Sequence, residues 1–313
     1  MGRVGIDLYP NELETPLSEV RTFTRFVGGF AGNVSTGLAR LGVRAAIVSR
    51  VGEDGHGDFV RSWLAAQGVD VRFLAVDPYW QTPPTFCEVW PPDHFPLTFY
   101  RKPTAPDWQL TPGDFDAREV SGAPLLYATG TALAQSPSRE TTLAALRAHG
   151  GTTIFDLDWR PSLWNEPREY PGLAAEAVAA ADIVIGNEEE MDAARVEAPT
   201  LVLKRGARGA TVFEDGEETQ VAGFPVEVVN GLGAGDAFAA ALGHALLAEL
   251  PLVEGVRRGT VAGALVASRL ACSEAMPRLE ELEVAAQRPV FEVDEARRSR
   301  ENREVPASER VER

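Results

Sequence analysis

The sequence has little cysteine, little lysine and no long apolar run, and each shortage excludes a class of protein. Its 313 residues include 2 cysteines, Cys87 and Cys272, too few and too far apart for a disulfide framework. Lysine occurs only at Lys102 and Lys204, and the formal net charge is -16, which argues against nucleic acid or anionic membrane as a partner. No apolar run approaches the ~20 residues of a membrane span, and the first residues do not read as a signal peptide. We therefore expect a cytoplasmic protein with reduced thiols.

Short apolar runs alternate with helical patterns along most of the chain. Apolar residues at helical spacing, such as Phe59, Val60, Trp63 and Leu64, fit between most of these runs. The runs typical of buried strands are residues 45–48, 125–128, 153–157, 183–185, 201–203 and 226–229. This alternation predicts an α/β fold with a mostly parallel central sheet and helices on both faces. Sites in such folds lie at the carboxyl ends of the strands.

Two segments break the alternation and indicate a second, smaller sheet. Residues 20–27 alternate in polarity, and residues 85–90 and 97–101 flank a proline-rich turn. Both patterns are typical of antiparallel strands. Inserted at about residues 10–28 and 82–102, these strands would form a lid on a domain spanning residues 1–286, and a lid can exclude water from a site. The charged stretch 287–313 is predicted to be a disordered tail.

The most informative segment is a glycine-rich stretch that ends in Asp236. Gly233, Ala234 and Gly235 lie between an apolar run and a helical pattern, so their amides can converge on an anion at a helix N-terminus. The carboxylate of Asp236 could accept a proton from a hydroxyl while these amides stabilise a transferred phosphoryl group. An ordinary glycine-rich turn capped by an aspartate would look the same, and the local pattern does not decide between the two.

Three further motifs accompany this segment: Gly28-Gly29-Phe30-Ala31-Gly32-Asn33, Asn187-Glu188-Glu189-Glu190 and Lys204-Arg205-Gly206-Ala207-Arg208-Gly209. With these motifs, residues 1 to about 285 resemble the PfkB family of carbohydrate kinases, the ribokinase-like sugar kinases. Residues 1–10, 91–101 and 230–232 are similar to the branch of that family that acts on 5-dehydro-2-deoxygluconate in inositol catabolism. The resemblance implies a ribokinase-like three-layer α/β/α domain whose small β-sheet lid closes over the sugar and forms a homodimer interface.

The resemblance also implies ATP and Mg²⁺ as cofactors and leaves open a monovalent cation such as K⁺. Asp236 would be the catalytic base, and Gly233, Ala234 and Gly235 the anion hole. Asn187 and Glu190 would organise Mg²⁺, which prefers oxygen ligands and keeps several waters. An acidic first helical turn without any metal is the alternative interpretation of these two residues. The other nucleotide-binding positions, beside Asn187, would be Lys204, Gly206, Gly209 and Thr260.

Four positions near the N-terminus would bind the sugar in this comparison. Asp7, placed after the first strand, matches the acid that hydrogen-bonds sugar hydroxyls, although a strand-end aspartate can also simply cap a turn. Gly28 and Gly29 would let the sugar approach the backbone. Asn33, at the opening of a helix over residues 34–41, can both donate and accept, or can act only as an N-cap.

Arg101 and Arg160 bear on the substrate class. A neutral sugar needs no guanidinium group, whereas a sugar acid gains charge-assisted hydrogen bonds from one. Both arginines resemble acid-recognising positions of keto-deoxy-sugar-acid kinases, although an isolated arginine is more often a solvated surface residue. The expected reaction is direct in-line phosphorylation of the terminal hydroxyl of 5-dehydro-2-deoxy-D-gluconate. The alternatives are a 2-keto-3-deoxygluconate kinase or another sugar kinase of this fold, and a non-catalytic sugar- or nucleotide-binding regulator.

Overall fold

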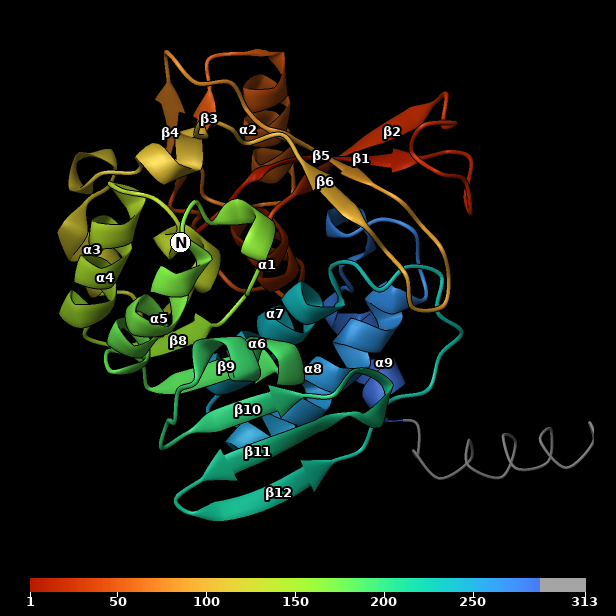
Figure 1. The fold of residues 1–313 in the computed structure, drawn as a ribbon. Coiled ribbons are helices and arrows are strands. Elements are labelled where there is room, and N and C mark those ends of the chain that lie inside the picture. The colour runs from red at the N-terminus through yellow and green to blue at the C-terminus, as the bar shows by residue number, and fades with distance from the viewer. Residues whose placement is uncertain (288–313) are drawn as a thin grey trace, which may run out of the picture.

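The structure is a computed structural model that describes residues 1–287. Its main body is a six-stranded sheet with helices on both faces (Figure 1). The strand order is β12-β11-β10-β9-β8-β7, in which the four strands from β7 to β10 are parallel and the β11–β12 hairpin is antiparallel. The strands are β7 (Leu125–Thr129), β8 (Thr152–Asp156), β9 (Ile183–Asn187), β10 (Leu201–Lys204), β11 (Ala210–Glu214) and β12 (Glu217–Val221).

Successive residues of the central strands pack into two separate apolar layers. In β8, Ile154 packs with the helices on one face, and its neighbour Phe155 packs with those on the other. One layer contains α1 (Phe30–Arg40), α7 (Ala234–Leu247) and α8 (Leu252–Ala267), with α9 (Leu279–Ala286) against α8; the other contains α4 (Ser138–Ala148), α5 (Tyr170–Val178) and α6 (Glu188–Ala194). Strands buried on both faces need continuous apolar runs, which is why the sequence pattern predicted the central strands. The predicted three-layer α/β/α class is confirmed.

A second sheet of four strands projects from the main body, in red and orange in Figure 1. Its order is β2-β1-β5-β6, formed by β1 (Gly5–Pro10), β2 (Phe23–Gly28), β5 (Pro84–Cys87) and β6 (Leu97–Phe99). The β1–β2 and β5–β6 pairs are antiparallel, as expected, whereas β1 and β5 are parallel. The predicted small lid sheet is therefore confirmed, and it also includes the first strand of the chain. The domain boundary at residue 286 stays a prediction, and the predicted disordered tail lies, beyond Gln287, outside the described residues.

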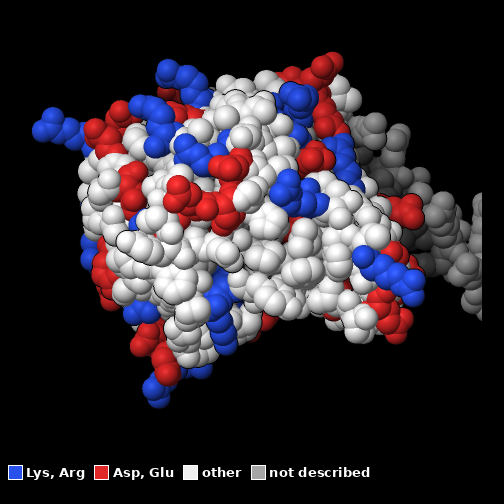
Figure 2. Space-filling view, turned by 90° about the horizontal axis from the view of Figure 1, so that it is seen from above, with Lys and Arg blue, Asp and Glu red and all other residues white. Residues whose placement is uncertain are grey.

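Two further strands and two further α-helices lie in the described part of the chain, besides several short 3-10 helices. They are the parallel pair β3 (Ser49–Gly52) and β4 (Leu74–Asp77) and the helices α2 (Gly55–Ala66) and α3 (Ala117–Ser121). Within residues 1–287, none of the helices is long and apolar enough to cross a membrane. On the face shown in Figure 2, basic and acidic side chains are interspersed, and the described residues form no continuous basic surface there.

Some local predictions were wrong. Residues 226–229 form no strand, because the amides of Val229 and Asn230 both bond to the carbonyl of Ala267 at the end of α8. Residues 45–48 contribute only an isolated bridge between Ala46 and Asp70, and the strand proper begins at Ser49. The helix expected over residues 34–41 begins four residues earlier, at Phe30.

Replacing Gly37 with alanine should destabilise the protein, because the new Cβ would lie 2.5 Å from the Cβ of Ala240 where α1 packs on α7. Overpacking costs about 1–3 kcal/mol, more than the roughly 1 kcal/mol that alanine gains over glycine in a helix. Urea unfolding should therefore show a lower midpoint for Gly37→Ala. Gly172→Ala is the matched control, since its Cβ would meet no described atom within 4 Å and should leave the midpoint unchanged or raised. Equal midpoints for the two variants would contradict the close helix contact.

Candidate active site

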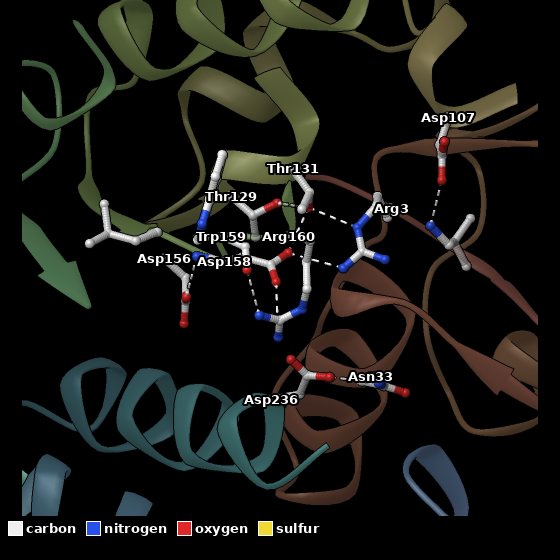
Figure 3. Close-up of polar contacts among 12 residues, drawn as sticks. Arg3, Asn33, Asp107, Thr129, Thr131, Asp156, Asp158, Trp159, Arg160 and Asp236 are labelled. Atoms are coloured by element: carbon white, nitrogen blue, oxygen red, sulfur yellow. Dashed lines mark hydrogen bonds and ion pairs between the residues drawn. The ribbon is translucent and has the colours of Figure 1, made fainter. Parts of the chain in front are cut away.

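The parallel strands end at one edge of the central sheet, and the N-terminus of α7 faces the same edge (Figure 3). Asp156 ends β8, Asn187 ends β9 and Lys204 ends β10, while Asp236 is the third residue of α7. The topology therefore collects side chains from distant parts of the sequence. This is the position at which α/β folds place their ligands.

Asp236 is held by a helix on the other side of the site. Its Oδ2 accepts a hydrogen bond of 2.6 Å from Nδ2 of Asn33. Asn33 is the fourth residue of α1 and Gly29 is the N-cap, so the N-cap interpretation of Asn33 was wrong. Burial raises the pKa of Asp236 to about 6, against the opposing effect of the Asn33 hydrogen bond. A carboxyl group with this pKa is suited to accepting a proton near neutral pH.

The start of α7 presents hydrogen-bond donors beside this carboxylate. Gly233 is the N-cap with φ 80°, a conformation that favours glycine. Among the described residues, the amides of Gly233, Gly235 and Asp236 donate to no backbone or side-chain acceptor, whereas Ala234 donates to Gly231 at 3.3 Å. Nζ of Lys204 would lie 3.7 Å from a Cβ at Gly235. Open amides and an ammonium group together make this turn suitable for an anion.

Lys204 is fixed by carboxylates at the strand ends. Its Nζ lies 3.0 Å from Oδ2 of Asp156 and 3.8 Å from Oε2 of Glu190. Burial alone would lower the pKa of Lys204, but these two carboxylates outweigh it and raise the pKa above its ordinary value. Lys204 therefore carries a positive charge next to the open amides.

A second set of ion pairs surrounds Asp158, which follows β8. Its Oδ2 lies 3.1 Å from Nη2 of Arg3 and accepts from the hydroxyl of Thr131 at 2.6 Å, and its Oδ1 lies 3.3 Å from Arg160. Burial would raise the pKa of Asp158, but Arg3 and Arg160 outweigh it and lower the pKa below its usual range. Figure 3 shows the guanidinium of Arg160 projecting towards Asp236. The side chain of Arg160 is 40% exposed, so a ligand can reach it.

Asn187 and Glu190 do not fit direct coordination of Mg²⁺. The Asn187 side chain accepts from the Glu190 amide, and the Glu190 side chain accepts from the Asn187 amide, so the pair forms a capping box on α6. The other contacts of Glu190 are with Arg160 at 3.4 Å and Lys204 at 3.8 Å. Within residues 1–287, no group of three or more histidine, cysteine, aspartate or glutamate side chains could hold a metal ion. These contacts agree with the helix-capping interpretation, and the magnesium role of Asn187 and Glu190 through water stays a prediction.

The predicted sugar-binding residues lie where the lid sheet meets the main body. Asp7 is in the middle of β1, not after it, so its predicted place was wrong. A Cβ at Gly28 would collide with the Asp7 carboxylate, and one at Gly29, where φ is 85°, would lie 2.7 Å from the carbonyl oxygen of Arg3. The two glycines thus make room for protein groups. Burial raises the pKa of Asp7 to about 7, with Arg3 and Arg101 opposing it.

Arg101 is buried, so the expectation that an isolated arginine is a solvated surface residue is wrong for this position. Its Nη2 pairs with Asp107, and its guanidinium lies 4.6 Å from the ring centre of Trp108. Asp107 also accepts the amide of Val4 at 2.9 Å, which joins Arg101 to the chain just before β1. Among the described residues, Nε of Arg101 has no hydrogen-bond partner.

The remaining nucleotide-binding predictions lie outside the network around Asp236. Gly206 and Gly209 belong to the turn between β10 and β11 and have φ values of 57° and 87°. Thr260 is on α8, and its hydroxyl donates to the carbonyl of Val256 at 3.0 Å. It lies three residues before Gly263, whose added Cβ would be 2.9 Å from the carbonyl oxygen of Ala234. Thr260 is therefore close in sequence to a contact with α7.

The sequence interpretation did not name Arg3, Asp107, Thr131 or Asp156 as site residues, and it placed Asp158 at the carboxyl end of a strand without giving it a role. Asp156 and Asp158 had a usable signal, because they lie at the end of a predicted buried strand. Arg3 had none, since its partner Asp158 is 155 residues away, and the bond from the amide of Val4 to Asp107 spans 103 residues.

Comparison with known proteins identifies the class to which this fold and site belong. A family model described as pfkB family carbohydrate kinase matches residues 1–279. The chain therefore belongs to the PfkB family of carbohydrate kinases, which confirms the resemblance predicted from the motifs. Two similar curated proteins are the 5-dehydro-2-deoxygluconokinases of Geobacillus kaustophilus, 36% identical over 90% of this chain and 91% of that protein, and of Photobacterium profundum, 33% identical over 90% and 92%.

Solved structures agree with this assignment. A sugar kinase from Pyrococcus horikoshii in complex with ATP superposes with a TM-score of 0.83 at 27% identity, covering 91% of this chain and 97% of that one. A fructokinase from Vibrio cholerae, solved with fructose, ADP and calcium ion, gives a TM-score of 0.81 at 28% identity over the same shares. The shared fold is that of a ribokinase-like sugar kinase.

Removing the Asn33 side chain should move the acid limb of the pH–rate profile to higher pH. The hydrogen bond from Asn33 favours the ionised form of Asp236, whose pKa is about 6, so Asn33→Ala should raise that pKa. Sugar-kinase turnover measured from pH 5 to 9 should then fall most at pH 6 and recover towards pH 8. Asn11→Ala, which removes an exposed side chain, should leave the profile in place. Coincident profiles for Asn33→Ala and the parent would contradict the role given to this contact.

Proposed function

We propose that this chain is an ATP-dependent kinase that phosphorylates the terminal hydroxyl of 5-dehydro-2-deoxy-D-gluconate. The observation that carries the proposal is the position of Asp236, a partly buried carboxylate with a raised pKa beside three open amides at a helix N-terminus. Similarity to curated 5-dehydro-2-deoxygluconokinases supports the choice of substrate.

In this proposal the reaction is an in-line transfer between two bound substrates. Asp236 accepts the proton of the sugar hydroxyl as its oxygen bonds to the terminal phosphorus of ATP, and the bond from that phosphorus to the bridging oxygen of ADP breaks. The open amides of Gly233, Gly235 and Asp236, with Lys204 and Arg160, stabilise charge on the transferred group. The amide of Ala234, also predicted for the anion hole, would first have to leave the carbonyl of Gly231. The fixed positions of these groups spare the cost of reorganising solvent during the transfer.

The proposal keeps Mg²⁺ as a companion of the nucleotide phosphates, where it would neutralise their charge. Asn187 and Glu190 would reach it only through water, because their side chains already cap α6 and contact Arg160 and Lys204. Gly206, Gly209 and Thr260 remain candidate nucleotide contacts. No residue is assigned to K⁺, and the homodimer through the lid stays a prediction.

The acid group of the substrate would bind Arg101. Its Nε is buried without a described partner, which is costly, and a carboxylate oxygen would satisfy it. Arg101 and Arg3 both act on the pKa of Asp7, so this guanidinium lies near the carboxylate proposed to bind sugar hydroxyls. Arg160 faces Asp236 instead, which suits it better to the phosphoryl group than to the acid end of the sugar (Figure 3).

Asp236→Asn should abolish turnover without unfolding the protein. General-base catalysis contributes about 10²–10⁴-fold, so turnover should fall by at least that factor while ATP still binds. The folded-state pKa is raised, which means that ionised Asp236 destabilises the folded state above pH 6. The variant should therefore be at least as thermally stable as the parent at pH 8. Parental turnover by Asp236→Asn would instead favour the non-catalytic regulator.

A substrate panel tests the acid assignment. ADP release should be fastest with 5-dehydro-2-deoxy-D-gluconate, slower with 2-keto-3-deoxygluconate, and slowest with ribose and fructose. Replacing Arg101 removes a charge-assisted hydrogen bond to the acid group of the substrate. The change should therefore raise the Michaelis constant for the sugar acid by about tenfold or more and leave the Michaelis constant for ATP nearly unchanged.

The better probe is the double variant Arg101→Met with Asp107→Asn, since Arg101→Met alone would leave Asp107 buried and unpaired. Arg118→Met, at an exposed position, is the control. Turnover of ribose but of no sugar acid would refute the substrate proposal. Equal effects on both Michaelis constants would remove Arg101 from the sugar site.

A further inference from the structure

Arg3 is a buried arginine to which the proposed reaction gives no role. It lies just before β1, and its backbone carbonyl accepts from the amide of Ala31 at 3.0 Å, at the start of α1. Nε of its guanidinium donates to the hydroxyl of Thr131 at 2.8 Å, and Nη2 donates to Asp158 at 3.1 Å. The guanidinium carbon lies 5.7 Å from the ring centre of Phe99 in β6. The protein therefore holds two of the three nitrogens and fixes the plane of the group.

The third nitrogen of Arg3, Nη1, is directed away from these partners. Figure 3 shows it pointing away from Asp158 and Thr131. Among the described residues it has no acceptor, yet it is not closed off from solvent as Nε of Arg101 is. A guanidinium group has N–H donors on every nitrogen and no acceptor. Nη1 of Arg3 is therefore a fixed, charged donor that is available to a ligand.

The charge of Arg3 reaches both carboxylates that the proposed function assigns to the sugar. Burial raises the pKa of Asp7 to about 7 and the pKa of Asp236 to about 6, and Arg3 opposes both shifts. The carboxylate of Asp158 that accepts from Arg3 also pairs with Arg160, which projects towards Asp236 (Figure 3). Arg3 thus lies between the carboxylate proposed to bind sugar hydroxyls and the proposed catalytic base.

The proposed substrate carries an acceptor that matches this donor. In 5-dehydro-2-deoxy-D-gluconate, a ketone stands on the carbon next to the one that bears the terminal hydroxyl. A ketone oxygen only accepts hydrogen bonds, so the ionised carboxylate of Asp7 cannot bind it, whereas a guanidinium group can. The proposed function assigns Arg101 to the acid group, and Arg160 and Lys204 to the phosphoryl group. Arg3 is then the cation placed to bind the ketone.

This inference rests on the proposed function: we propose that Arg3 determines specificity for an α-hydroxy ketone, because its Nη1 donates to the ketone oxygen beside the reacting hydroxyl. The hydrogen bond draws electron density from the carbonyl group, which makes the neighbouring hydroxyl more acidic and favours transfer of its proton to Asp236. An alcohol at the same carbon is tetrahedral, so its oxygen leaves the plane of the carbonyl and loses its alignment with Nη1 of Arg3.

A pair of sugar acids tests the inference without any change to the protein. 2-Deoxy-D-gluconate differs from 5-dehydro-2-deoxy-D-gluconate only in having an alcohol in place of the ketone. The parent protein should bind the ketone about tenfold more tightly or better by calorimetry, because a hydrogen bond from a charged group is worth about that factor. Equal dissociation constants for the two acids would overturn the inference. Failure of the parent to phosphorylate either acid would refute the proposed function as well.

Arg3→Lys separates recognition of the ketone from support of the site. Lysine keeps a positive charge beside Asp158, but its ammonium group is a single centre that cannot hold Thr131 and Asp158 and also reach a ligand. The variant should raise the dissociation constant of the ketone by about tenfold or more. The dissociation constant of 2-deoxy-D-gluconate and the Michaelis constant for ATP should change by less than about threefold, since neither depends on this hydrogen bond.

Arg147→Lys is the matched control, because Arg147 forms an exposed ion pair with Glu176. It should change none of these constants. Equal effects of Arg3→Lys on the binding of both acids would make Arg3 a structural residue, which would overturn the inference and leave the proposed function intact.

Discussion

The desolvation of one partly buried carboxylate, that of Asp236, is the constraint around which the site is arranged. An ionised group in this position needs compensation, which comes from the Asn33 hydrogen bond and from the positive charges of Arg3 and Lys204. Each of these partners comes from a different element, so the packing of α1 on α7 and the register of the parallel strands fix the proton affinity of Asp236. The same desolvation that costs folding energy gives the carboxyl group a pKa useful for catalysis.

Much of the fold could be predicted because strands covered on both faces need continuous apolar runs. The β7 to β10 strands were predicted in this way, and so was the position of Asp158, Asn187 and Asp236 at the carboxyl ends of the strands. The small sheet was predicted instead from alternating polarity and a proline-rich turn. The β11–β12 hairpin was missed although its turn carries a recognisable Asp215-Gly216 pair, with φ values of 53° and 82°. The run at residues 226–229 was assigned wrongly because periodicity cannot tell a paired strand from an extended segment that bonds to a helix end.

The site was less predictable than the fold, since its contacts depend on which distant segments meet. Arg101 pairs with Asp107, and Asp107 in turn accepts a hydrogen bond from the amide of Val4. The contact between Asp107 and Val4 depends on the position of β1 beside β5. Glu190 shows the opposite case, in which a local capping signal was present in the sequence and the contacts agree with it. A local pattern thus marked the start of α6 but misplaced the start of α1 by four residues, and tertiary contacts determined the charge of each group.

The turn that precedes α7 is in contact with the projecting sheet. The Cα of Gly233 lies against Cys272, whose Sγ is 2.6 Å from the hydroxyl of Tyr9 in β1, two residues beyond Asp7. Phe95, between β5 and β6, lies against Gly231 just before the same turn. The projecting sheet and the turn are therefore joined by direct side-chain contacts through Cys272 and Phe95. A hinge motion of that sheet would have to carry the turn with it or break the thiol–phenol contact, which couples the position of the sheet to that of the turn.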